Sequence, residues 1–214
     1  PWKGWRKTYS VVRQTSKRRW SAGARGFPEG GPVNPLGCHA LVWAGGWTAD
    51  DARRAVAGIA AAGFDFVEIP LRRPRDIDLA ALRPELLHAG YPSLMPFWCR
   101  NVTALRDAFD AAKALGITTS LDLAHVADGS VASTVDWAAW FAHTLRATDI
   151  LSPSWDDVAS ALGPRGEPTR DSLAAVAAEL VAQGVAVVQL SAGRAGFLLR
   201  TADRDRLARG GAAL

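Results

Sequence analysis

The sequence predicts an α/β fold with a mostly parallel sheet flanked by helices. Short apolar segments suited to buried strands alternate with helical segments from residue 37 to residue 201. Glycines follow several of the helical segments, where helix C-termini are expected. No internal repeat or heptad pattern interrupts this alternation.

The first strand–helix–strand unit occupies residues 34–71. The run CHALVW is short and apolar, as in a buried parallel strand. Thr48 is placed to cap the next helical segment, and Asp50 and Asp51 fall in its first turn, where the helix dipole favours acids. Gly63 is expected to end this helix, and FDFVEIPL predicts the second strand. The unit is therefore a βαβ crossover, expected to be right-handed.

A second alternation follows the charged connector LRRPRDIDLAALRPE. LLHAGYP predicts a strand, Asn101 is placed to cap the helix VTALRDAFDAAKALG, and ITTSLDLA predicts the next strand. DILSPS is a short strand that leads into the helix WDDVASALG, and RDSLAAVAAELVAQG is another helix. VAVVQLS and GFLLRT form a strand pair around AGRAG. The helix TVDWAAWFAHTLRA carries large apolar side chains on one face, namely Trp137, Trp140, Phe141 and Leu145.

Composition is that of a soluble globular protein, with 49% hydrophobic and 21% charged residues in 214. No apolar stretch approaches the ~20 residues of a transmembrane helix, and the start of the chain lacks the pattern of a secretory signal. We therefore expect no membrane partner. Cys38 and Cys99 have no metal-ligand spacing, and the expectation of reduced thiols is in keeping with a cytoplasmic location.

Basic charge is concentrated in residues 1–33, which hold eight basic side chains and one acid, whereas the remainder holds 17 basic and 20 acidic residues. Tryptophans among basic residues are able to bind single-stranded nucleic acid by stacking and phosphate attraction. The segment resembles no nucleic-acid-binding module, and its end, GARGFPEGGPVNP, breaks regular structure. We therefore expect a disordered basic arm and no nucleic-acid partner.

The phrases NPLGCHALVWAGGW, DDARRAVAGIAAAGFD and VEIPL, within residues 34–71, resemble the opening βαβ of the D-tagatose and D-psicose 3-epimerases, which are TIM barrels. The resemblance implies metal-dependent sugar epimerisation with an ion such as Mn²⁺ or Co²⁺. The family's metal ligands lie on later strands, and no matching segments follow here. Only sugar-contacting strand ends would carry over, near His39, Trp43 and Glu68. A core histidine and a solvated strand-end glutamate are the alternatives for the first and last of these.

Residues 87–201 contain LHAGYPSLMP, ALGITTSLDLA, VDWAAWFAHTLRATDILSPSWDDV and AVVQLSAGRAGFLLRT. These phrases resemble the middle and nucleotide-side portion of the ribokinase-like (phosphofructokinase B, PfkB) carbohydrate kinases, in the family's order and at about its spacing. The resemblance implies ATP-dependent phosphorylation of a sugar hydroxyl with Mg²⁺. A sugar and a nucleotide are the implied small-molecule partners.

The kinase resemblance assigns roles to six residues. Asp122 matches an acid at a strand end before the nucleotide-facing half of the site. Ser154 and Asp157 occupy the positions of the family's Asn-x-x-Glu motif, which helps to place Mg²⁺ and phosphate, but both side chains are shorter here. The remaining three match the Gly-x-x-Gly turn beside the nucleotide and the polar residue that precedes it, and they are Gly193, Gly196 and Ser191.

The same residues also fit structural roles. Asp122 could cap the loop that follows its strand. Ser154 fits the N-cap of WDDVASALG, with Asp156 and Asp157 as first-turn acids favoured by the helix dipole. A lone Gly-x-x-Gly is most typical of a hairpin turn.

The kinase family places its catalytic base and anion hole in a Gly-Ala-Gly-Asp motif, and no such stretch occurs in this sequence, where Gly210 and Gly211 precede no acid. A general base contributes roughly 10²–10⁴-fold to a rate. We therefore expect a truncated or fused kinase-like chain that is inactive alone, and whether it is an enzyme stays open. The alternatives are a sugar isomerase or epimerase-related protein, and a non-enzymatic remnant or binding module with a basic arm.

These observations divide the chain into an arm (1–33), an epimerase-like βαβ segment (34–80), a ribokinase-like α/β segment (81–203) and a tail (204–214). Strands derived from two different sheets would leave an edge exposed, and exposed edges favour self-association. We therefore expect marginal stability or a homodimer.

Overall fold

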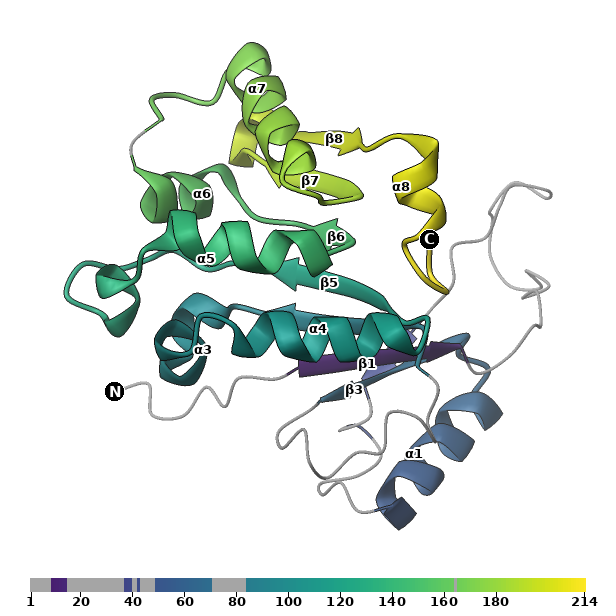
Figure 1. The fold of residues 1–214 in the computed structure, drawn as a ribbon. Coiled ribbons are helices and arrows are strands. Elements are labelled where there is room, and N and C mark those ends of the chain that lie inside the picture. Colours follow the sequence, from purple (N-terminus) through teal and green to yellow (C-terminus); the bar gives the residue numbers. More distant parts are fainter. Residues whose placement is uncertain (1–8, 15–36, 40–41, 43–48, 71–83, 164) are drawn as a thin grey trace.

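The computed structural model describes residues 9–14, 37–39, 42, 49–70, 84–163 and 165–214 (Figure 1). The expectations for Thr48, for the connector and for most of the basic arm lie outside these residues. Within them, no helix combines the length and the apolar character that crossing a bilayer requires.

The described strands form one eight-stranded sheet in the order β2-β3-β1-β4-β5-β6-β7-β8. Strands β2 and β3 are parallel, and β4, β5, β6 and β7 are parallel to one another. Strand β1 is antiparallel to both of its neighbours, and β8 is antiparallel to β7. The prediction of a mostly parallel α/β sheet is therefore confirmed. The strands are β1 (Tyr9–Gln14), β2 (Gly37–His39), β3 (Phe66–Pro70), β4 (Leu86–Gly90), β5 (Thr118–Asp122), β6 (Ile150–Leu151), β7 (Val187–Ser191) and β8 (Phe197–Thr201).

Helices connect the parallel strands, and α4, α5 and α7 lie together in front of the sheet in Figure 1. The α-helices are α1 (Ala49–Ala61), α3 (Pro96–Arg100), α4 (Ala104–Ala114), α5 (Trp137–Thr144), α6 (Trp155–Leu162), α7 (Arg170–Ala182) and α8 (Arg204–Ala208). Short 3₁₀ turns occur at η3 (Pro92–Leu94), η4 (Val131–Thr134), η5 (Leu145–Ala147) and η6 (Gly193–Ala195).

Strand β1 corrects the expectation of a disordered arm for residues 9–14. Val11 pairs with Ile69 of β3 on one side and with Leu87 of β4 on the other. The segment YSVVRQ contains a tyrosine and two valines, which favour strands, although basic and glycine-rich surroundings obscure this local preference. The strand hydrogen-bonds the epimerase-like part to the kinase-like part, so the two form one continuous sheet.

The start of α4 also differs from the prediction. Asn101 does not cap this helix, because α4 begins at Ala104 with Thr103 at its N-cap position. The preceding residues form a separate helix, α3, and Asn101 occupies its C-terminal end, where Nδ2 donates to the carbonyl oxygen of Phe97 at 2.8 Å. The side chain therefore satisfies a helix C-terminus and not an N-terminus.

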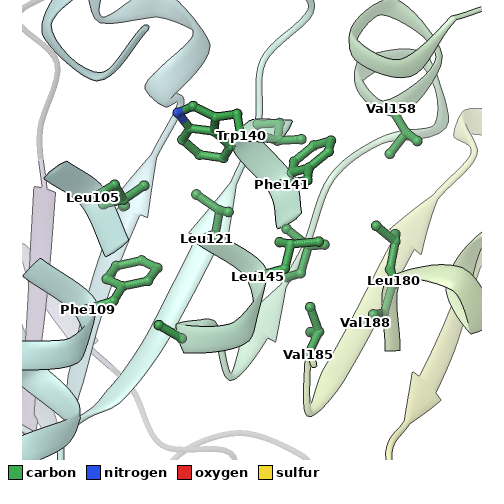
Figure 2. Close-up of a cluster of buried hydrophobic side chains, with 14 of the residues drawn as sticks. Leu105, Phe109, Leu121, Trp140, Phe141, Leu145, Val158, Leu180, Val185 and Val188 are labelled. Carbon is green, nitrogen blue, oxygen red and sulfur yellow. The ribbon is translucent and has the colours of Figure 1, made fainter. Parts of the chain in front are cut away.

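The hydrophobic core fills the space between the helices and one face of the sheet (Figure 2). All four apolar residues predicted on one face of the segment 137–145 are buried, and the rings of Trp137 and Trp140 lie 5.1 Å apart. Leu121 of β5 lies next to Trp140 and Phe141 in Figure 2. Burying a side chain of this size stabilises a fold by about 1.5–3 kcal/mol. The buried apolar side chains between α5 and the sheet therefore hold the ends of the neighbouring strands in place.

A buried ion cluster joins the C-terminal residues to the amino end of the sheet. Asp149, which precedes β6, is fully buried. Its carboxylate accepts hydrogen bonds from Lys113 Nζ at 2.6 Å and from the backbone N–H of Thr119 at 2.9 Å, and it pairs with Arg206 of α8 at 2.9 Å. The guanidinium of Arg206 also donates to the carbonyl oxygen of Gly184 at 2.6 Å. Residues 204–214 are therefore part of the packed body.

Candidate functional site

The candidate site lies where the carboxyl ends of β4, β5 and β6 meet at one edge of the sheet, the usual position of ligand sites in open α/β sheets. Asp122 is the last residue of β5, and Ser154 is the N-cap of α6, which follows β6. Tyr91 directly follows β4. The parallel register pairs Gly90 with Asp122, which brings the ends of β4 and β5 together.

Ser154 and Asp157 form a reciprocal capping box at the start of α6. The backbone N–H of Asp157 donates to Ser154 Oγ at 3.1 Å, and the backbone N–H of Ser154 donates to Asp157 Oδ2 at 2.9 Å. The Ser154 hydroxyl also donates to Asp157 Oδ2 at 2.5 Å. The capping interpretation is therefore confirmed, and the same bonds hold the Asp157 carboxylate at the strand-end edge.

Asp122 carries the clearest electrostatic perturbation at this edge. Burial raises its pKa from the ordinary 3.8 to about 6, and the neighbouring negative charge of Asp157 adds to the increase. The hydrogen bond from the backbone N–H of Leu123, at 2.8 Å, and the nearby Tyr91 side chain lower the pKa of Asp122 and so act in the opposite direction. Within the described residues, neither acid makes a salt bridge. The two carboxylates therefore repel each other without a counter-charge.

Tyr91 is the member of the site that the sequence patterns did not indicate. Its backbone is left-handed, with φ 58° and ψ 51°, and it is the one non-glycine residue in the described ranges with positive φ. Its N–H donates to the carbonyl oxygen of Asp122 at 3.1 Å, which ties the end of β4 to the end of β5. The charge of Asp122 raises the pKa of Tyr91, with smaller contributions from burial and from Asp157. The signal in the sequence that could have indicated this residue was a Tyr-Pro pair directly after the strand that neighbours the strand of Asp122.

Ser191 reaches the same edge from β7. It forms an isolated parallel bridge with Ser154, and its N–H donates to the carbonyl oxygen of Pro153 at 3.1 Å. The turn that follows joins β7 to β8, with Gly193 at φ 54° and Gly196 at φ 90°. The hairpin interpretation of the Gly-x-x-Gly motif is therefore confirmed. Asp122, Ser154 and Ser191 form a row at the carboxyl ends of β5, β6 and β7, with Asp157 bonded to Ser154, and the turn begins two residues beyond Ser191.

The residues named from the epimerase resemblance lie elsewhere. His39 and Glu68 are register partners on the parallel strands β2 and β3. Strands β1 and β4 separate them from β5, so they do not join the Asp122 row. Trp43 lies outside the described residues.

The oxygen atoms at the carboxyl-end edge near Asp122 are suited to a hard cation that is also bound to phosphate. Carboxylate and hydroxyl oxygens are suitable ligands for Mg²⁺, which usually takes one or two carboxylates together with water and substrate phosphates. The described ranges contain no cluster of three or more His, Cys, Asp or Glu side chains that could hold a metal on their own. The edge is therefore suited to sharing a cation with a ligand and not to caging it.

No protein-family model matches the sequence. Among curated proteins, the chain is 57% identical over 44 residues to L-ribulose 3-epimerase of Methylomonas sp. (strain DH-1) and 40% identical over 55 residues to ketose 3-epimerase of Arthrobacter globiformis. These matches cover 21% and 26% of this chain. The chain spans only 15% and 19% of the length of these two relatives.

Solved structures similar to this chain include kinases. They are pyridoxal kinase of Bacillus subtilis (14% identity, TM-score 0.36, covering 48% of this chain and 45% of that one), 2-dehydro-3-deoxygluconokinase of Thermotoga maritima (18%, 0.39, 59% and 41%) and a PfkB protein of Polaromonas sp. JS666 (19%, 0.41, 78% and 65%). Kinases thus occur among the structural neighbours, and ketose 3-epimerases occur among the sequence relatives.

Proposed function

We propose that the carboxyl-end edge formed by β4, β5 and β6 binds a divalent cation together with the phosphates of a nucleotide, as part of a carbohydrate-kinase-like site. One observation carries this proposal: Asp122 at the end of β5 and Asp157 in the first turn of α6 lie at the same edge, neither makes a salt bridge among the described residues, and the charge of Asp157 helps to raise the pKa of Asp122. A cation such as Mg²⁺ would remove this repulsion. The kinase-like phrases in residues 87–201 point to the same chemistry.

Each side chain has a distinct role in this proposal. Asp122 and Asp157 supply carboxylate oxygens to the cation or to its water ligands, and the capping box keeps Asp157 in place. The turn at 193–196 lies near the phosphates, because its positive-φ glycines leave room for close approach of a ligand to the backbone. Arg194 is exposed in this turn and adds a positive charge that attracts phosphate.

The parent reaction is transfer of a γ-phosphoryl group from ATP to a sugar hydroxyl. The phosphorus–oxygen bond to ADP breaks, a bond to the sugar oxygen forms, and a base takes the hydroxyl proton. The 214 residues contain no Gly-Ala-Gly-Asp stretch to supply that base. We therefore propose that this polypeptide binds the nucleotide and cation without turnover.

Thermal unfolding with Mg²⁺, ATP and both together tests the proposal. Preferential binding to the folded state should raise the Tm most with Mg²⁺ and ATP together, at millimolar concentrations. Asp157→Asn should lose this increase. Asp156→Asn is the matched control, because Asp156 is an exposed acid in the same helical turn and should retain it. No increase for the wild-type protein would overturn the proposal.

A second candidate function, related to ketose 3-epimerases, is favoured by the 57% identity over 44 residues. His39 and Glu68 on adjacent parallel strands would then contact a sugar. Calorimetric titration with Mn²⁺ or Co²⁺ and a ketose, compared with His39→Ala, tests this candidate. Loss of heat in the variant supports it, and no heat from the wild-type protein disposes of it.

A further inference from the structure

A cavity of about 580 Å³ lies between the end of α3 and the segment that leads from β5 into α5. Its lining comes from residues 99–102 on one side and from residues 129–139, which include η4 and the first turn of α5, on the other. None of the residues of the carboxyl-end row contributes to this lining. The volume is within the range of small-molecule sites, so the cavity is large enough to hold a ligand of its own.

Two buried tryptophans of α5 hold the walls of this cavity in place. Trp137 Nε1 donates to the carbonyl oxygen of Ala132 in η4 at 2.9 Å, and Trp140 Nε1 donates to the carbonyl oxygen of Trp98 in α3 at 3.3 Å. Both indole rings belong to the hydrophobic core. Because α5 is bonded to both walls, the space between them is formed before a ligand binds, which lowers the entropic cost of binding.

Three valines give the cavity an apolar surface. Val102, Val131 and Val135 line it, and each is only partly buried where it packs against the hydrophobic core. A hydrocarbon chain that covers these side chains would remove apolar surface from water on both partners. The valines therefore favour a ligand with an aliphatic body.

The charges of the lining indicate what the ligand carries besides this body. Arg100 lines the cavity, is exposed, and forms no salt bridge with any other described residue. Asp136, the acid of the lining, is already engaged as the N-cap of α5, where its carboxylate accepts the N–H of Ala139 at 3.0 Å. One available guanidinium beside one acid suits a single negative charge better than a double one. A carboxylate matches the guanidinium geometry.

We propose that this cavity binds a small aliphatic monocarboxylate, whose carboxylate pairs with Arg100 and whose hydrocarbon chain covers the three valines. This inference goes beyond the proposed cation and nucleotide site and does not depend on it. The site selects by charge and by apolar contact together, so neither a neutral analogue nor an inorganic anion satisfies it as well.

Equilibrium dialysis of radiolabelled hexanoate against the full 214-residue chain measures the binding. For so small a ligand we expect a Kd on the order of 1 mM. In competition with hexanoate, affinity should increase roughly 5- to 10-fold from acetate to butyrate, and again from butyrate to hexanoate, because each step adds two methylenes to the apolar contact. Hexanamide, which lacks the charge, and inorganic phosphate, which lacks the hydrocarbon, should both compete poorly.

Two pairs of variants locate the site. Arg100→Gln should weaken hexanoate binding about 10-fold, the size of one charge-assisted hydrogen bond, whereas Arg146→Gln replaces an exposed arginine of η5 outside the lining and should not. Ala139→Glu adds a negative charge to the lining and should also weaken binding. Its control is Ala138→Glu, at an exposed neighbouring position outside the lining. Both glutamates fall in the first turn of α5, where the helix dipole favours acids, so both variants should fold.

Weaker hexanoate binding by Arg100→Gln and Ala139→Glu, with both controls unchanged, supports the proposal. Equal binding by the wild-type protein and Arg100→Gln overturns it, as does no hexanoate binding up to about 20 mM. Displacement of hexanoate by phosphate more readily than by butyrate also overturns it, because the cavity would then recognise charge alone. Should Arg100→Gln fail to fold, Ala139→Glu decides by the same criterion. The Tm increase with Mg²⁺ and ATP should be the same in Arg100→Gln as in the wild-type protein, so each proposal fails or stands by its own measurement.

Discussion

Two acidic centres lie at opposite ends of the same parallel strands, and their surroundings differ. Asp149, at the amino end, is fully buried but contacts Lys113 and Arg206. Asp122, at the carboxyl end, is only partly buried, yet the charge that acts on its pKa is that of another acid, Asp157. A buried charge that is paired with opposite charges from other segments holds those segments of the fold together. A charge held beside a like charge is instead a candidate binding site.

The partners of the two acids come from different distances in the sequence. Lys113 belongs to α4 and Arg206 to α8, so the amino-end cluster joins three distant segments. The carboxyl-end row consists of residues that end a strand, such as Asp122 and Ser191, or that begin the helix after β6, such as Ser154 and Asp157. The cluster around Asp149 contributes to stability. The carboxyl-end row leaves side chains that are able to bind a ligand exposed at the edge of the sheet. Four variants test this contrast.

Replacement of the paired acid should have the largest effect. Asp149→Ala leaves Lys113 and Arg206 without their shared carboxylate, and we expect a loss of about 3–5 kcal/mol in the free energy of unfolding. Urea denaturation at pH 7 measures it. Asp110→Ala, which removes only a surface ion pair with Arg106, should change stability by at most about 1 kcal/mol. Equal losses in the two variants would contradict the contrast.

Arg206→Ala should have the next largest effect. Its guanidinium contacts Asp149, the carbonyl oxygen of Gly184 and that of Thr148. Because Lys113 still neutralises Asp149, we expect a loss of about 2–3 kcal/mol. Hydrogen exchange should increase first in residues 204–214. An equal increase in hydrogen exchange throughout the protein would contradict a local role of Arg206 in holding residues 204–214.

At the carboxyl end of the parallel strands, removal of the negative charge of Asp122 should stabilise the fold. The folded-state pKa of Asp122 is raised to about 6 from 3.8. Protonation of Asp122 therefore stabilises the folded state fully below pH 3.8, and this stabilisation is lost as pH rises through 6. Asp122→Asn should therefore exceed the wild-type stability at pH 7 by on the order of 1 kcal/mol, after allowance for solvent screening. Urea denaturation at pH 4 and pH 7 gives the difference, which should be several-fold smaller at the lower pH.

The smallest effect concerns the coupling between the two acids. Asp157→Asn removes the neighbouring charge, so the pKa of Asp122 should fall towards its ordinary value while remaining raised by burial, which is the larger cause. NMR of ¹³Cγ-labelled aspartate follows this titration. The Asp156→Asn control should leave it unchanged, and an equal fall in both variants would show that the coupling is not specific.

Local patterns were sufficient for much of the fold. Apolar spacing located the buried face of α5, and the Ser154 cap was readable because capping involves residues three apart. Strand β1 was missed because its pairing partners lie far away in the sequence. Asn101 was assigned to the wrong helix because a short helix, α3, intervenes.

The candidate site was predictable to the extent that it follows from strand ends. Asp122 and Ser154 were identified from the resemblance to the kinase family, and the parallel strands bring them to one edge. Tyr91 was not, because the Tyr-Pro pair marks the end of β4 but does not indicate the positive φ of the tyrosine. The partners of Asp149 were equally hidden, since Lys113 and Arg206 meet it only through tertiary contacts.

Strand β1 also determines when the sheet can be completed during synthesis. Ser10 leaves the ribosome before Pro70 and His88, yet it pairs with both of them. The strand must therefore wait, unpaired, until both partners have emerged, and contacts this distant in sequence form slowly. During that interval the nascent chain exposes strand edges that chaperones would need to shield.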